Sequence, residues 1–337
     1  DPMSKDLLLD ALTREGVLAS AGVRYPRFTK RLQPEDLGLE ESEASQRLLS
    51  LGHKKLLPKE ALADLRLVES RVHALVEAAS FPFLGGIARF IPNAKLGAVQ
   101  QELETLRRDF DEARQRFIAQ YDEHRVEALE AWEEAARELP GDPVLLMATI
   151  RGAFPDAERL AERFRCDVHF FQVRAPERVS TRLVRLAEQQ ELAQARNTAA
   201  REAGARIREG VESFVRDAVA TLREQTAKLC QQMLVAMQEG KSGVHQKTLN
   251  RLVHFIDEFK QLNFAGDHQM EALLENARNE LLSRSAGEYR EDATARSRLE
   301  SGIRQLAHQA MQLAQEDTSE LVEQFGQLGV RKFQLAA

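Results

Sequence analysis

The stretch RFRCDVHFFQVRAPE, residues 163–177, decides the fold class that we predict for this chain. Apolar and polar residues alternate along it, as they do in a β-strand with one buried face. Most of the remaining sequence consists of helix-forming residues, so this stretch predicts that a β element interrupts a helical protein. The residues expected on one face are Phe164, Cys166, Val168 and Phe170, and those on the other are Arg165, Asp167 and His169.

A single strand needs a partner, and the sequence offers one near its beginning. Residues 16–31, GVLASAGVRYPRFTKR, lose the helical period and gain valine and aromatic residues, and Pro26 breaks any helix there. We expect strands near 16–25 and 164–174, which pair with each other as a small antiparallel β element.

A second interruption is FPFLGGIARFIPNAKL, residues 81–96, which carries two adjacent glycines between two prolines. The segment is too apolar for an exposed phosphate loop, and adjacent glycines let a backbone turn or approach another element closely. We interpret it as a buried joint between a helix at 59–79 and a helix at 95–138, packed against the small β element. The residues assigned to this joint are Phe83, Gly85, Gly86 and Pro92.

The helices are read from their apolar spacing. In 95–138, Leu103, Phe110 and Phe117 recur every seven residues, the pattern of a coiled coil or a helical hairpin. After Val179 the chain is nearly free of proline, and we predict one very long helix at 180–238. Further helices are predicted near 248–262, 270–284 and 290–325. Long helices joined by short turns pack antiparallel.

The predicted fold is therefore mainly α with a small antiparallel β element. We expect a mixed, mostly helical N-terminal domain at 4–178, of α+β type, that contains both strands. We expect the second domain, 179–337, to be an elongated helical bundle or coiled-coil arm, built as a long antiparallel hairpin.

Composition narrows the classes of function. The chain has 337 residues, of which 43% are hydrophobic and 30% charged, and its net charge of −6 gives no global electrostatic case for nucleic-acid binding. Its two cysteines are far apart in sequence, which argues against a disulfide framework and favours a reducing compartment. No apolar run reaches the roughly 20 residues of a membrane span, and no leader-like segment is present. We expect a soluble, cytoplasmic protein.

No catalytic signature rises above background. EGKSG, residues 239–243, contains Gly-Lys-Ser, but the phosphate-loop pattern needs a glycine where Val235 stands and a strand before it, so a helix end is the simpler interpretation. None of the eight histidines has metal-ligand spacing. Cys166 and His169 fall on opposite faces of the predicted strand. We therefore expect no catalytic residue, no metal site, no cofactor and no enzymatic activity.

The segment VRYPRFTKR, residues 23–31, interleaves cations with aromatic rings, a chemistry suited to phosphates and stacked bases. The alternative is a surface loop whose rings plug the domain and whose cations meet nearby acids such as Glu35 and Asp36. Both interpretations stay open at this point. The candidate contacts to nucleic acid or a partner are Arg24, Tyr25, Arg27, Lys30 and Arg31, with Lys54 and Lys55 as further cations.

The C-terminal helices also allow two interpretations. A pair of amphipathic helices usually buries its apolar stripe within itself. An arm of this length also exposes much surface, and such arms serve homo-oligomerisation or the docking of a partner.

Several segments together resemble a known family. They occur in the order KRLQPEDLGL (30–39), LLSLGHKKLLPKEAL (48–62), FPFLGGIARFIP (81–92), FDEARQRFIAQYDE (110–123) and RFRCDVHFFQVRAPE (163–177). This ordered set resembles DUF3150, a bacterial family of unknown function, and the resemblance spans roughly residues 10–180. It implies a mobile-element protein encoded near MoxR-type AAA+ ATPases and von Willebrand A-domain proteins. The family has no established catalytic residues, so none carries over.

These observations lead to one expected function and two alternatives. We expect a non-enzymatic scaffold or adaptor, or a regulated substrate, of a MoxR-type AAA+ ATPase and von Willebrand A-domain system on a mobile element or in phage defence. The first alternative is a nucleic-acid-binding protein of a plasmid or phage that uses residues 24–31. The second is a self-assembling structural protein that is built through its C-terminal helices.

Overall fold

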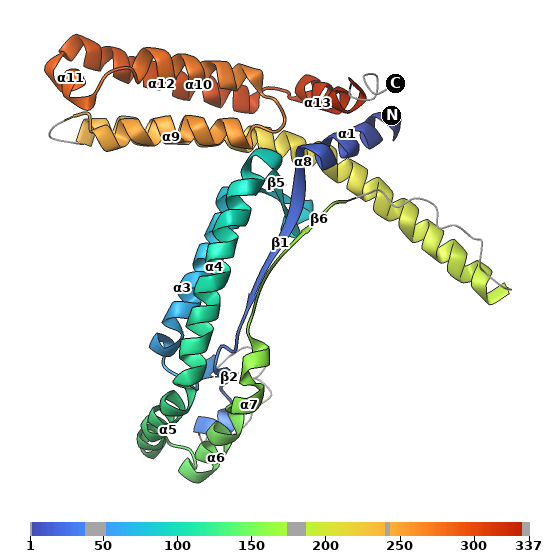
Figure 1. Cartoon of the computed structure of the whole chain (residues 1–337), viewed down its shortest axis with the longest axis vertical. Coiled ribbons are helices and arrows are strands. Elements are labelled where there is room, and N and C mark those ends of the chain that lie inside the picture. The colour runs from blue at the N-terminus through green and yellow to red at the C-terminus, as the bar shows by residue number, and fades with distance from the viewer. Residues whose placement is uncertain (1, 38–51, 174–186, 240–242, 332–337) are drawn as a thin grey trace. The chain divides into compact units, whose positions relative to one another are not determined.

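The computed structural model describes residues 2–37, 52–173, 187–239 and 243–331 (Figure 1). It divides into two compact units, which we describe one at a time. The first unit comprises the described parts of Asp1–Ser20, Ala79–Gly97 and Phe170–Ala337, and the second comprises those of Ala21–Ala78 and Ala98–His169. The predicted domain boundary at 178–179 lies outside the described residues and stays a prediction.

Four strands form the main sheet in the order β4-β5-β1-β6. Its strands are β1 (Gly16–Arg24), β4 (Phe81–Phe83), β5 (Ala88–Pro92) and β6 (Arg165–Phe171). β1 and β6 are neighbours, as predicted, and β5 pairs antiparallel with β1 from Gly16↔Pro92 to Ala19↔Arg89. The predicted fold class, mainly α with a small antiparallel sheet and long C-terminal helices, is confirmed.

The segment at 81–96 differs from its prediction. It connects two helices, but β4 and β5 within it form an antiparallel hairpin with Phe83 opposite Ala88. Phe83 and Pro92 are buried, whereas Gly85 and Gly86 are exposed at the turn, so a buried joint is the wrong description for the glycines. They have φ values of 68° and 89°, with no atom within 4 Å of a Cβ placed on either. The turn requires glycine for its left-handed backbone, not for close packing.

In the second unit, which shares some elements with the first, helices α3 (Ala63–Ala78) and α4 (Asn93–Ala119) lie alongside the sheet strands of that unit (Figure 1). Its other elements are α5 (Tyr121–Glu138), α6 (Pro143–Ala153), α7 (Ala157–Leu160), β2 (Thr29–Arg31) and β3 (His53–Lys55), with 3-10 turns at Pro34–Leu37, Lys59–Leu62 and Ala161–Arg163. The repeat of Leu103, Phe110 and Phe117 is buried, as predicted.

The helix predicted at 95–138 is two helices. The backbone of Gln120 leaves the helical region, with φ −98° and ψ 1°, and α5 begins at Tyr121. Tyr121 is buried, its hydroxyl donates a hydrogen bond to the carbonyl of Pro155 over 2.8 Å, and its ring lies 5.8 Å from that of Phe28. The chain changes direction at Gln120, and this places the Tyr121 ring in the core. The seven-residue pattern of the sequence does not reveal this break.

The first unit is built around α8 (Ala187–Glu239), a helix of 53 residues. Its buried stripe includes Val211, Phe214, Ala218 and Leu222. Helix α12 packs along α8, and the N-terminal helix packs against α8 and α13. The other helices of this unit are α1 (Pro2–Glu15), α9 (Gln246–Leu262), α10 (His268–Leu281), α11 (Ala286–Glu291), α12 (Ala293–Gln315) and α13 (Ser319–Arg331).

A buried ion pair ties three of these helices together. Arg223 of α8 donates from Nε to Asp267 Oδ2 over 2.6 Å and from Nη1 to the carbonyl of Leu313, at the end of α12, over 2.5 Å. The other oxygen of Asp267 accepts the backbone N–H of Met270 and caps α10. Both charged side chains are at most 4% exposed. Such a pair tolerates the loss of one partner poorly, because the other charge stays buried.

We predict that Arg223→Met and Asp267→Asn each lower the free energy of unfolding by about 3–5 kcal/mol, and that the double variant loses less than the sum. Urea denaturation followed by far-UV circular dichroism measures both. Lys260→Met is the matched control, because it breaks the exposed pair with Glu275 and should cost less than about 1 kcal/mol. Equal losses for buried and exposed pairs would contradict the role given to Arg223.

Candidate functional site

The basic and aromatic segment at 24–31 runs from the end of β1 into β2. Tyr25 is 6% exposed, and its hydroxyl donates to Glu69 Oε2 of α3 over 2.8 Å. The guanidinium of Arg27 lies 4.0 Å from the centre of the Tyr25 ring and donates to both oxygens of Glu69, over 2.7 Å and 2.5 Å. Two of the candidate contact residues therefore hold each other and a carboxylate of α3.

The electrostatics of this cluster agree with its geometry. Burial and the hydrogen bond to Glu69 raise the pKa of Tyr25 to about 12. The hydrogen bond from Arg27 lowers the pKa of Glu69, and the same bond raises the pKa of Arg27. The cluster is a neutralised, mutually stabilised pair with a protonated phenol beside it, and it offers little attraction to a phosphate.

Phe28 belongs to the core of the second unit. It is 4% exposed, and the centre of its ring lies 5.5 Å from that of Phe117 and 6.4 Å from that of Phe154. Its φ of +50° places it in the left-handed region, a strain that burial of the ring among aromatic neighbours can offset. Neither Phe28 nor Tyr25 has an open face for a base, which favours the interpretation of rings that plug the domain.

Most of the remaining cations lie on a short ribbon of β2 and β3, whereas Arg24 is the last residue of β1. β2 and β3 are antiparallel, with Arg31 opposite His53 and Lys30 opposite Lys54. Lys54 is buried and bonded to Asp36 over 2.6 Å. Those that stay exposed and make no ion pair with a described residue are Arg24, Lys30, Arg31 and Lys55.

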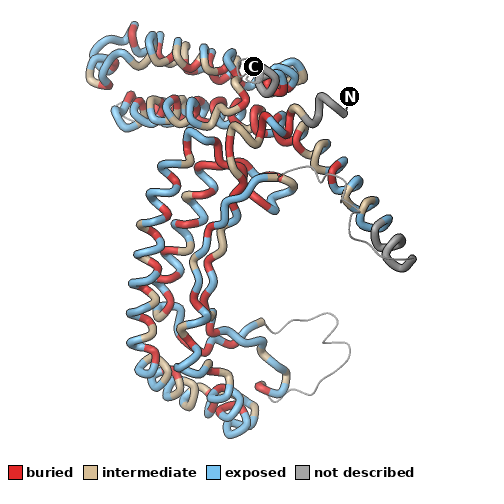
Figure 2. The backbone as a smooth tube through the Cα atoms, turned by 45° about the vertical axis from the view of Figure 1, so that its right-hand side comes forward, coloured by how far each residue is buried: buried red, intermediate tan, exposed pale blue. Residues whose placement is uncertain are grey.

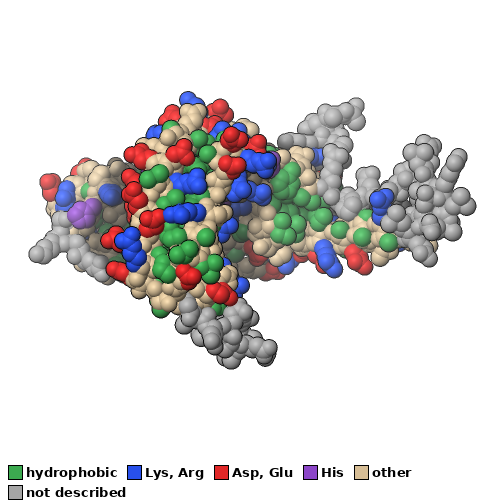
Figure 3. Space-filling model, turned by 90° about the horizontal axis from the view of Figure 1, so that it is seen from below, with side chains coloured by type: hydrophobic (Ala, Val, Ile, Leu, Met, Phe, Trp, Pro, Cys, Tyr) green, Lys and Arg blue, Asp and Glu red, His purple; other side chains and the backbone are tan. Residues whose placement is uncertain are grey.

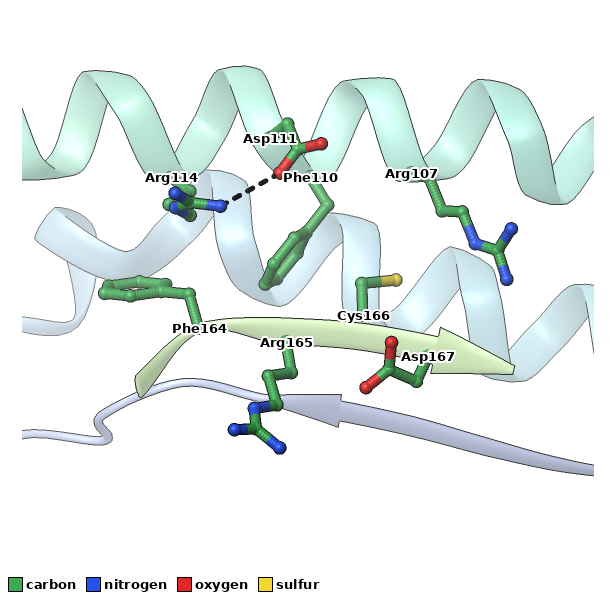
Figure 4. Close-up of a pocket in the computed structure, with 8 residues that line it drawn as sticks. All are labelled: Arg107, Phe110, Asp111, Arg114, Phe164, Arg165, Cys166 and Asp167. Carbon is green, nitrogen blue, oxygen red and sulfur yellow. Dashed lines mark hydrogen bonds and ion pairs between the residues drawn. The ribbon is translucent and has the colours of Figure 1, made fainter. Parts of the chain in front are cut away.

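A groove of about 520 Å³ lies between α4 and the chain around the start of β6 (Figure 4). Phe110 and Phe164, which line it, are 2% and 5% exposed. Arg107, Phe110, Asp111 and Arg114 follow the spacing i, i+3, i+4, i+7 and therefore share one face of α4. The lining residues are Arg107, Phe110, Asp111 and Arg114 from the helix, and Phe164, Arg165, Cys166 and Asp167 from the strand and the residue before it.

The charges of the groove are only partly paired. Arg114 makes a long ion pair of 3.3 Å with Asp111, and its Nε is buried without a hydrogen-bond partner. Arg107 and Arg165 make no hydrogen bond or ion pair through their side chains with any described residue. Three arginines against two aspartates leave a formal charge of +1.

Cys166 is half-buried at the wall of this groove. Burial raises the pKa of its thiol, Arg107 lowers it, and the two aspartates of the groove raise it further. A raised pKa keeps the thiol protonated near neutral pH, which is the opposite of what a catalytic nucleophile requires. His169 is exposed on β6, and burial alternates from Phe164 to Val168 as the predicted faces require, but Phe170, the last residue of the predicted apolar face, is exposed.

Within the described ranges, no group of three histidine, cysteine, aspartate or glutamate side chains could hold a metal ion. Nor does any described helix have the length and apolarity to cross a membrane. Gly240, Lys241 and Ser242 of the Gly-Lys-Ser segment lie outside the described residues, and Val235 belongs to α8.

Sequence reasoning missed the acid that neutralises the segment and the groove itself. Glu69 lies 42 residues from Arg27, so no local pattern links the two. The groove had a weak signal, because two arginines seven residues apart flank a core phenylalanine on one helix face. Recognising it also required knowing that 164–167 lie beside that face.

We predict that Tyr25 makes stability fall at high pH. The pKa of its phenol is about 12 in the folded protein and near 10 when unfolded, so its contribution is complete below pH 10 and is lost as the pH rises towards 12. Tyr25→Phe should be less stable than the parent at pH 8, and the gap should shrink by about 2–3 kcal/mol near pH 12. Urea titrations over this range measure the gap. A gap independent of pH would show that the phenol titrates normally.

Comparison with known proteins agrees with the resemblance described above. Residues 18–288 match the family described as protein of unknown function (DUF3150), which is well over half of the chain. No curated protein and no solved structure matches the chain. The matched range contains the basic segment, the β-hairpin and the groove, together with the whole of α8. On this evidence the chain belongs to the DUF3150 family.

Proposed function

We propose that this protein is a non-enzymatic scaffold or adaptor that acts with a MoxR-type AAA+ ATPase and a von Willebrand A-domain protein. It serves a bacterial mobile element or a phage-defence system in the cytoplasm, either as the partner that positions the ATPase or as a substrate that the ATPase remodels. The identity of the partners rests on the family resemblance. The structural support is the exposed surface at the beginning of the long helix α8.

The observation that carries the proposal is the beginning of α8. From 194 to 209 the only buried residue is Gly204, whereas the stripe that starts at Val211 is buried against the rest of the unit (Figure 2). At 1.5 Å per residue the whole helix is about 80 Å long. We call residues 194–209 the arm. Ile207 packs against the core of the unit, but most side chains of the arm are exposed, and exposed helical surface of this kind suits the docking of another chain.

The arm has a chemistry that fits a protein partner. Its exposed residues include Ala195, Ala199 and Ala203 as well as charges of both signs. Small side chains let another helix approach closely, and mixed charges can pair across a helical interface. A coiled coil with a partner and one between two copies of the chain both use such a surface, and the experiment below separates them.

Nucleic-acid binding is the weaker candidate. The two rings that a base would need are buried, Arg27 is engaged by Glu69, and the net charge is −6. Figure 3 shows acidic and basic side chains interspersed on the face that it displays. A salt-sensitive gel shift through the exposed cations of β2 and β3 at about 50 mM salt would revive this function.

We predict that the tagged full-length chain, expressed from its native operon, retains the AAA+ ATPase and the von Willebrand A-domain protein. The triple variant A195E/A199E/A203E should lower their recovery about tenfold, because it adds three charges to the arm. Its thermal midpoint should not change, because these side chains are exposed.

The matched control is Q225E/Q231E/Q238E, which adds the same charge at exposed positions of the packed half of α8. Failure of the parent chain to retain either partner would refute the proposal. If both triple variants lower the recovery of the partners equally, the arm is not the docking surface. Light scattering of the purified chain tests self-assembly, and dimers that the arm variant dissociates would assign the arm to a second copy.

A further inference from the structure

β6 has a free edge. It is the last strand of the order β4-β5-β1-β6, so β1 occupies one of its sides, and no described strand occupies the other. The backbone N–H and C=O groups along such an edge lack strand partners and can pair with an added strand.

The groove beside α4 runs along this edge. Its strand wall consists of the four consecutive residues Phe164–Asp167. Successive side chains of a strand point to opposite faces, so a cavity that touches all four must pass along the edge and not over one face. Helix α4 supplies the opposite wall (Figure 4). A groove between an edge strand and a helix is a geometry in which an extended peptide binds by strand addition.

The charges of the groove select the kind of peptide. The guanidinium groups of Arg107 and Arg165 pair with no described residue, and Nε of Arg114 has no acceptor among the described residues. Arginine binds carboxylates in a planar, bidentate arrangement. A phosphate backbone fits less well, because Asp111 and Asp167 also line the groove and its two phenylalanine rings are too buried to stack on bases.

We propose that the groove between β6 and α4 binds an extended acidic segment of a partner protein. The segment adds as a strand to the edge of β6 and places carboxylates against Arg107, Arg114 and Arg165. Because it names a partner site for the proposed scaffold, this inference rests on the proposed function. Its test uses only the purified chain and synthetic peptides, so its failure can be told apart from a failure of partner capture.

The test is fluorescence anisotropy with the purified full-length chain and a labelled peptide of seven glutamates, which presents carboxylates on both faces of an added strand. We expect saturable binding that weakens about tenfold in Arg107→Glu and in Arg165→Glu. Both positions are exposed, so these variants should fold. Arg108→Glu is the matched control, because Arg108 is an exposed neighbour on α4 that does not line the groove.

Two further peptides separate strand addition from simple charge attraction. A peptide of seven lysines should not bind. An acidic peptide with N-methyl groups on alternate backbone amides, which cannot complete the strand hydrogen bonds, should bind at least about tenfold more weakly. Equal binding of the methylated peptide would overturn strand addition, and no binding of the acidic peptide, or equal loss in Arg108→Glu, would overturn the site.

The thiol of Cys166 gives an independent reading of where the peptide binds. Cys166 lines the groove, whereas Cys230 is fully buried with a pKa raised to about 12, so only Cys166 should react with an alkylating reagent in the folded protein. The acidic peptide should slow this reaction in proportion to occupancy. Binding without protection of Cys166 would place the peptide elsewhere. Stronger protection by single-stranded DNA than by the peptide would assign the groove to nucleic acid.

Discussion

The ring of Phe214 on α8 is the contact on which the packing of the β-hairpin depends. Its centre lies 5.1 Å from that of Phe83 and 5.4 Å from that of Phe90, edge-on to both, and 5.9 Å from the stacked ring of Phe264. Each such pair of rings stabilises the fold by about 0.5–1.5 kcal/mol beyond the effect of burying apolar surface. Because Phe83 and Phe90 come from paired strands, this cluster fixes which face of the hairpin is buried. With the hairpin joined to β1 on one side, β6 is left at the outer edge.

Elements whose signal is local could be predicted from the sequence. The alternation at Phe164–Val168 revealed β6, and the seven-residue repeat of Leu103 revealed the buried face of α4. The hairpin at 81–92 escaped because its strands have three and five residues, too few for a period to show beside two prolines. The end of α4 escaped because it depends on where Tyr121 packs, which is tertiary information.

The candidate sites show the same limit. The interleaved cations and rings at 24–31 suggested a nucleic-acid surface, but a sequence does not state which charges are neutralised from elsewhere. Glu69 on α3 engages Arg27 and Tyr25, and Asp36 engages Lys54. Conversely, Arg107 and Arg165, which pair with no described residue, were not predicted as part of a site, because each was one charged residue among many in the sequence. Composition gives the number of charges, and only the fold decides which remain available.

The pattern of β6 also bears on which strand its edge accepts. An antiparallel pairing of two copies centred on Asp167 would place that carboxylate opposite itself and Arg165 opposite His169. Like charges directly opposite destabilise a strand pair, and charged side chains are a common protection of an exposed edge. An acidic segment meets no such penalty at the arginines and gains charge-assisted hydrogen bonds there. Asp167 therefore discourages self-pairing, and the arginines beside it favour a partner that carries carboxylates, so an edge strand can remain open and still be selective.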